Sequence, residues 1–144
     1  MYSEGDPNNQ PNHFISDEHV AANDRASSQS VMRAHLLSTI QYLQSFGIEV
    51  VLVHSVAMLP KVVQALPENY AVPLAQLQQQ NLFMTEFARD HAAELHLNVL
   101  DPAPILCGRG ACMTRANGNV LYTDNNHISP AGAALLIPLI ASSM

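Results

Sequence analysis

The sequence predicts an α/β domain with a parallel sheet flanked by helices, and three features support that prediction. Helix-like segments alternate with short apolar segments, which is the pattern of parallel sheets joined by helices. The segment 48–53 contains four consecutive apolar residues, which suits a parallel strand covered on both faces. A chain of 144 residues is also long enough to bury one core.

The first third of the chain is predicted to contain one helix and one strand. Residues 1–30 are polar, so we expect an irregular lead-in. Ser30 suits the N-cap of a helix over residues 31–46, and Gly47 suits its end. The strand over 48–53 follows directly.

The middle of the chain predicts a loop, a helix and a second strand. Three prolines interrupt residues 56–73, so we expect a loop there. A helix over 74–95 and a strand over 97–100 follow. Two parallel strands with helices make a poor free-standing core, so residues 31–144 are expected to be the C-terminal part of a larger α/β domain.

The last third is predicted to hold a hairpin and a helix. Asn117-Gly118 is a strong turn signal between short strands over 113–115 and 120–122. Ser129 suits a helix N-cap, Pro130 suits the first helical position, and we expect Pro138 to kink or end the helix.

Composition narrows the possible partners. The formal net charge of −6 disfavours nucleic acid and anionic membranes, which both attract basic surfaces. The longest apolar stretch, residues 131–141, is too short to span a bilayer, and the polar N-terminus does not resemble a signal peptide. Taken alone, and if Met1 is the natural start, these features predict a cytoplasmic protein.

The two cysteines, Cys107 and Cys112, are separated by four residues. This is not the spacing of a redox Cys-x-x-Cys motif, and no second Cys/His pair completes a zinc site. A local disulfide is the favoured interpretation and two unpaired thiols are the alternative. A disulfide would indicate an oxidising compartment rather than cytoplasm.

The segment from Asp124 to His127 holds the most informative pair of side chains. It lies between the predicted hairpin and the last helix, where loops of α/β proteins carry function. A tight turn there would bring the carboxylate back to the imidazole, fix its tautomer and stabilise the imidazolium. Alternatively, Asp124 only caps a turn and His127 packs against it.

Two runs of sequence resemble a known family. The first is Cys107-Gly108-Arg109-Gly110-Ala111-Cys112, and the second is Leu121-Tyr122-Thr123-Asp124-Asn125-Asn126-His127-Ile128-Ser129-Pro130-Ala131-Gly132-Ala133. Together they resemble the end of the SGNH hydrolase domain that is fused to acyltransferase-3-type membrane proteins, which O-acylate bacterial cell-surface sugars. Ile128 stands where that family usually has Leu.

The resemblance implies a fold and a site. The fold would be the SGNH, flavodoxin-like three-layer sandwich, present here as its C-terminal half. Asp124 would be the triad carboxylate and His127 the base, while Cys107 and Cys112 would form the family's disulfide. The family's Gly-Asp-Ser block does not occur in the sequence, because Gly5-Asp6 is followed by Pro7. The serine and the oxyanion residues are therefore expected upstream of this chain.

The resemblance also implies a function and a location. The chain would be part of a serine-dependent O-acyltransferase or esterase that acts on acyl groups, acetyl above all, of cell-surface glycans. Its partners would be an acylated glycan or acyl donor and an acyltransferase-3-type membrane domain. The intact parent protein would lie in the periplasm or outside the cytoplasm, attached to the inner membrane, and would need no metal or organic cofactor.

The same residues are also compatible with other functions. The chain could be a catalytically inactive SGNH remnant or a glycan-binding module. A metal site built from Cys107, Cys112, Asp124 and His127 is a third reading, although the seven histidines form no recognised metal motif. Three further side chains have ordinary structural explanations: Ser55 as a strand-end residue, Ser129 as a cap, and Arg109 as a solvated loop charge rather than a contact for an anionic substrate.

Overall fold

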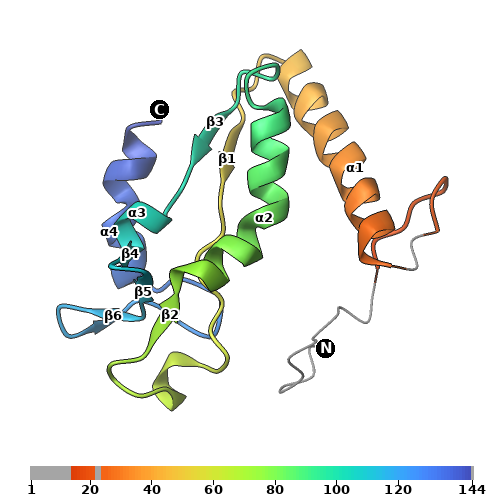
Figure 1. The fold of residues 1–144 in the computed structure, drawn as a ribbon. Helices are drawn as coiled ribbons and strands as arrows, with labels where there is room; N and C mark the ends of the chain where they lie inside the picture. Colours follow the sequence, from red (N-terminus) through yellow and green to blue (C-terminus); the bar gives the residue numbers. More distant parts are fainter. Residues whose placement is uncertain (1–13, 22–23, 144) are drawn as a thin grey trace. The chain divides into compact units, whose positions relative to one another are not determined.

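The computed structural model describes residues 14–21 and 24–143, which form two separate units divided after Val50. The expected serine-block position, Gly5-Asp6-Pro7, lies outside the described residues, as does much of the predicted lead-in. The first unit contains the helix α1 and the second contains every strand (Figure 1).

The helix α1 (Arg25–Ser45) begins six residues earlier than the sequence predicts. Its N-cap is Asp24 rather than Ser30, because the Asp24 carboxylate accepts a hydrogen bond from the backbone N–H of Ser27 at 2.7 Å. Residues 25–30, the end of the predicted lead-in, are therefore helical. Gly47 follows the helix with a φ of +74°, as expected for a helix stop.

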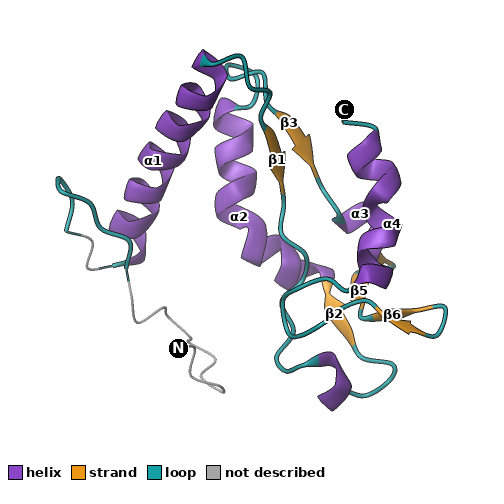
Figure 2. Cartoon of the chain, turned by 180° about the vertical axis from the view of Figure 1, so that it is seen from behind, coloured by secondary structure: helices purple, strands orange, loops and turns teal. Residues whose placement is uncertain are grey.

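The second unit contains a small parallel sheet of β1 (Val51–Val53) and β3 (Asn98–Leu100), with Leu52 opposite Val99. Helix α2 (Leu74–His91) lies alongside β1, and α4 (Pro130–Ala141) lies on the β3 side, as both ribbon views show (Figures 1 and 2). This mixture of helices and a parallel sheet fits an α/β fold. The three-layer sandwich and the half-domain assignment stay predictions.

The prediction that the first strand is covered on both faces is wrong for the described structure. Leu52 is buried, but the side chains of Val51 and Val53 are exposed. The strand is also shorter than the predicted 48–53, and helix α2 ends before the predicted Leu95. Pro138 does not end the last helix, which continues to Ala141.

The remaining strands are antiparallel and were mostly not predicted. The sheet β2-β5-β4 consists of Ala71–Pro73, Ala111–Met113 and Cys107–Gly108, with the short helix α3 (Ala103–Leu106) before β4. The predicted hairpin turn at Asn117-Gly118 is confirmed, but its strands are β6 (Arg115–Ala116) and β7 (Asn119–Val120) rather than 113–115 and 120–122. Asn117 and Gly118 both have positive φ, as a type I′ turn requires.

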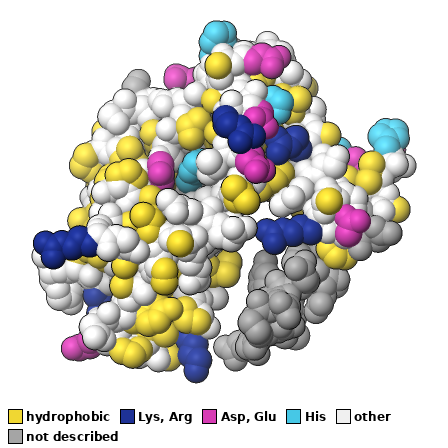
Figure 3. Space-filling view, viewed as in Figure 1, with side chains coloured by type: hydrophobic (Ala, Val, Ile, Leu, Met, Phe, Trp, Pro, Cys, Tyr) yellow, Lys and Arg dark blue, Asp and Glu magenta, His cyan; other side chains and the backbone are white. Residues whose placement is uncertain are grey.

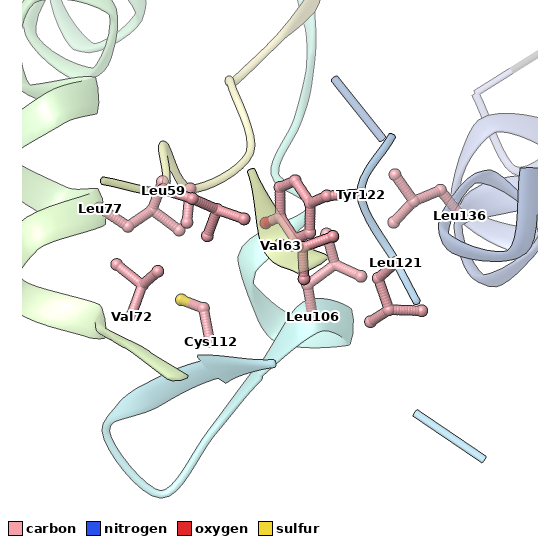
Figure 4. Packing of buried hydrophobic residues seen from close by; sticks show 10 residues of the cluster. Leu59, Val63, Val72, Leu77, Leu106, Cys112, Leu121, Tyr122 and Leu136 are labelled. Carbon is pink, nitrogen blue, oxygen red and sulfur yellow. The ribbon is translucent and has the colours of Figure 1, made fainter. Parts of the chain in front are cut away.

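A hydrophobic core in the second unit collects side chains from β2, α2, α3, β5, α4 and the segments that connect them (Figure 4). Tyr122 and Leu121, which directly precede the Asp124 segment, are each 1% exposed. The other members are Ala57, Leu59, Val63, Val72, Leu77, Leu106, Cys112 and Leu136. Burying each large apolar side chain contributes about 1.5–3 kcal/mol, so this core fixes the backbone from which Asp124 projects.

Hydrophobic side chains are visible over much of the face drawn in Figure 3, whereas the Lys and Arg side chains on it stand as separate groups. Exposed apolar side chains are common on folded proteins and need no special explanation. Among the described residues, this face shows no continuous stripe of basic side chains of the kind that binds phosphate backbones. The exclusion of nucleic acid as a partner stays a prediction.

Candidate functional site

The segment 123–127 forms a closed turn between the β6–β7 hairpin and α4. The backbone N–H of Thr123 donates to the carbonyl of His127 at 2.8 Å, and Tyr122 and Ile128 form a single antiparallel bridge on either side. Asp124 and His127 are thereby held at fixed positions of one small loop.

The Asp124 carboxylate closes this turn with both of its oxygens. Oδ1 accepts hydrogen bonds from the backbone N–H groups of Asn126 at 2.9 Å and His127 at 2.7 Å. Oδ2 lies 2.7 Å from Nδ1 of the His127 ring. The carboxylate–imidazole contact predicted from the spacing is therefore present, and the turn-capping role offered as its alternative is present as well.

The same hydrogen bonds set the charge of Asp124. The backbone N–H of Asn126, the imidazole of His127 and the backbone N–H of His127 lower the pKa of Asp124 from 3.8 to about 2. Asp124 is therefore ionised at neutral pH and can only accept a hydrogen bond. The neutral His127 ring must then carry its proton on Nδ1, which leaves the lone pair on Nε2.

His127 is open to a reacting partner. Its side chain is 74% exposed and that of Asp124 is 40% exposed. Among the described residues, no hydrogen bond joins Nε2 of His127 to a serine hydroxyl. The arrangement can orient an imidazole, accept a proton at Nε2 and stabilise the resulting cation.

Contacts from outside the turn hold it on the core. The backbone N–H of Leu59 donates to the carbonyl of Asn125 at 2.7 Å, which ties the turn to a loop from the middle of the chain. The hydroxyl of Ser129 accepts from the backbone N–H of Gly132 and donates to the carbonyl of Val120. Ser129 is therefore the N-cap of α4, as predicted.

Gly132 allows α4 to approach the preceding backbone closely. A Cβ atom at this position would collide with the carbonyl oxygen of Leu121 and with the side chain of Ile128. Sequence reasoning missed this role and that of Leu59. A glycine in the first turn of a helix is unfavourable unless packing requires it, so Gly132 did carry a signal. The Leu59 contact is made by a backbone N–H, which any residue but proline supplies.

Cys107 and Cys112 form a disulfide, which confirms the favoured interpretation and excludes unpaired thiols. The two residues face each other across the β4–β5 pair, and Cys112 is 1% exposed. The four-residue metal site considered from the sequence is wrong, because both sulfurs are already bonded to each other. Among residues 14–21 and 24–143, no group of three or more His, Cys, Asp or Glu side chains is arranged to hold a metal.

Ser55 is held in a structural network. Its hydroxyl donates to Oδ1 of Asn81 at 2.6 Å, and the Asn81 side-chain N–H donates to the Ser55 carbonyl. This agrees with its interpretation as a strand-end residue. Arg109 lies exposed on the turn between β4 and β5, with a φ of +51°.

Comparisons with known proteins identify the family. A family model described as SGNH domain (fused to AT3 domains) matches residues 1–142. The comparison with curated proteins and the comparison with solved structures each found no match. In the part of the chain that the structure describes, no helix is both long and apolar enough to cross a membrane. Because the match extends over nearly the whole chain, this chain belongs to the family of SGNH domains fused to AT3 domains.

Proposed function

We propose that this chain supplies the carboxylate and the base of a serine-dependent acyl-transfer site. The single observation that supports the proposal most is the pairing of an ionised Asp124 with Nδ1 of an exposed His127, which leaves Nε2 as a proton acceptor. Membership of a family fused to AT3 domains supports acyl-transfer or hydrolase chemistry.

In this proposal the nucleophile is a serine in a Gly-Asp-Ser block that lies outside these 144 residues. Nε2 of His127 takes the proton from the serine hydroxyl while the serine oxygen bonds to the carbonyl carbon of an acyl ester. The imidazolium then returns the proton to the departing alcohol, which leaves an acyl-serine. A glycan hydroxyl or a water gives its proton to Nε2 as it attacks, and the serine leaves with that proton.

We further propose acyl groups of cell-surface glycans, acetyl above all, as the substrates. The parent protein would then lie outside the cytoplasm next to an AT3-type membrane domain. Two features support this placement: the AT3 fusion that defines the family, and the Cys107–Cys112 disulfide, since disulfides persist in oxidising compartments.

The test uses the protein encoded by the complete reading frame, checked by its native mass. If that frame places a Gly-Asp-Ser block ahead of this chain, a fluorophosphonate probe is expected to label its serine, and His127→Ala is expected to abolish labelling. A frame that begins at Met1, with a native product that a fluorophosphonate does not label, would contradict the enzyme proposal. The inactive remnant or glycan-binding module would then be the better description.

A further inference from the structure

A cleft of about 400 Å³ lies within the second unit, and no residue of the Asp124 turn lines it. One wall is a single face of α2, because Leu74, Leu77, Asn81 and Thr85 follow one another at three- and four-residue spacings. The other lining residues are His54, Gln78, Asp101, Ala103, Pro104 and Cys107.

The cleft sits at the carboxyl ends of both parallel strands. His54 directly follows β1 and Asp101 directly follows β3, and the backbone N–H of His54 donates to the carbonyl of Leu100 at 2.9 Å. Ligands of open parallel sheets bind outside this edge. Neither Asp124 nor His127 lines the cleft, so a ligand there would not occupy the acid–base pair.

The side chains that line the cleft favour a ligand with a positive charge. Among the described residues that line the cleft, Asp101 is the only carboxylate and none is a Lys or Arg. Oδ1 of Asp101 accepts the backbone N–H of Ala103 at 2.9 Å, while Oδ2 has no hydrogen-bond partner among the described residues. An exposed carboxylate with a free oxygen attracts a cation and repels an anion.

The side chains that line the cleft also favour a ligand with an apolar body. Leu74, Leu77, Ala103 and Pro104 supply aliphatic surface, and Cys107 is bonded in the disulfide. Nε2 of His54 is buried without a hydrogen-bond partner among the described residues, which is an unfavourable state for a polar atom. Apolar walls with a few convergent polar groups are typical of small-molecule sites.

We propose that this cleft is a binding site for a small cationic ligand: an amine with an apolar body that packs on α2 and a positive end that meets the Asp101 carboxylate. The inference does not depend on catalysis by Asp124 and His127.

Titration of the intact chain with two probes of matched size and opposite charge tests the proposal. Phenethylamine is expected to give saturable shifts in the backbone N–H resonances of His54, Leu77 and Asp101. The expected dissociation constant is in the millimolar range, because a ligand with so few non-hydrogen atoms can make only a limited number of contacts. Phenylacetate is expected to bind about tenfold more weakly, because attraction to Asp101 becomes repulsion.

Two variants and one control sharpen the test. Asp101→Asn keeps an acceptor for the Ala103 N–H but removes the charge, so it is expected to abolish the preference for the amine. Glu68→Gln removes an equal charge from an exposed position outside the cleft and is expected to leave the preference unchanged. Thr85→Trp places a large side chain in the cleft and is expected to weaken the binding of both probes. Absence of saturable shifts at the three named residues, or equal affinity of the two probes for the unmodified chain, would overturn the proposal.

Discussion

The two units of the chain each contain an Asp–His pair built in nearly the same way. Oδ1 of Asp17 accepts the backbone N–H groups of His19 and Val20 at 2.9 and 2.7 Å, and Oδ2 lies 2.8 Å from Nε2 of His35. Asp124 makes the matching bonds at 2.9, 2.7 and 2.7 Å. In both pairs the pKa of the carboxyl group is lowered, chiefly by a backbone N–H.

The pairs differ in which imidazole nitrogen is left unbonded. His35 comes from α1, eighteen residues away in sequence, and presents Nε2 to its carboxylate. Its remaining nitrogen, Nδ1, is flanked by the Cβ of its own side chain. His127 belongs to the same turn as Asp124 and presents Nδ1, so the open Nε2 remains. An Asp–His hydrogen bond alone is therefore weak evidence for catalysis, and the identity of the free nitrogen matters more.

The two pairs also differ in the contacts that hold them in position. The turn of Asp124 follows directly on the buried Leu121 and Tyr122 and is tied to Leu59 and to the start of α4. The segment of Asp17 is anchored on α1 by the hydrogen bond from the N–H of Ile15 to the hydroxyl of Ser28. A catalytic base must be held in a fixed position, and of the two described pairs the Asp124 turn is the one that directly follows members of the hydrophobic core.

The largest expected contrast is in activity. In a full-length protein that carries the proposed serine, His127→Ala is expected to lower acyl transfer by about a thousandfold or more, because the proton acceptor is lost. His35→Ala is expected to change the rate by less than about twofold. Initial rates of hydrolysis of an activated acetyl ester measure both. A comparable loss in the two variants would contradict the distinction between the pairs.

A stability comparison tests the support of the Asp124 turn. Gly132→Ala is expected to destabilise the chain by about 1–3 kcal/mol, because its Cβ collides with the Leu121 carbonyl and the Ile128 side chain. The control is Gly108→Ala, whose Cβ meets no atom within 4 Å and is expected to change stability by less than about 0.5 kcal/mol. Urea unfolding measures both, and equal effects would mean that the close approach of α4 is unimportant.

The smallest expected effect is the change of folding stability with pH. Because the folded pKa of Asp124 is about 2 and its ordinary value is 3.8, its contribution to stability is present above the ordinary value and is lost as the pH falls toward 2. The pKa of Asp17 is also lowered, so both carboxyl groups act in the same direction. Carboxyl-carbon resonances followed from about pH 6 to pH 2 measure the two midpoints. A midpoint for Asp124 at or above 3.8 would show that the turn is not closed in solution.

The sequence predicted the contact between Asp124 and His127 and the Cys107–Cys112 disulfide better than it predicted the strands around them. Asp124 and His127 lie three positions apart in one turn, and Cys107 and Cys112 lie at the two ends of a short loop, so local spacing was sufficient to predict both contacts. Ser129 and Pro130 marked the start of α4 for the same reason.

The parts that were missed depend on distant or backbone contacts. β2 pairs with β5 across about forty residues of sequence, and no local pattern specifies that partner. The start of α1 was misplaced because its first turns are polar, and a search for apolar periodicity passes over them. The pair of Asp17 and His35 was also missed, since the two residues lie eighteen positions apart.

The tautomers of the two histidines test the central claim most directly. Two-bond ¹H–¹⁵N correlation spectra of the intact chain, recorded about two units above the ordinary imidazole pKa of about 6.5, separate Nδ1–H from Nε2–H rings. We expect His127 to carry its proton on Nδ1 and His35 to carry its proton on Nε2. A His127 ring protonated mainly on Nε2 would have no lone pair on that nitrogen to accept the proton of a serine, which would contradict its assignment as the base.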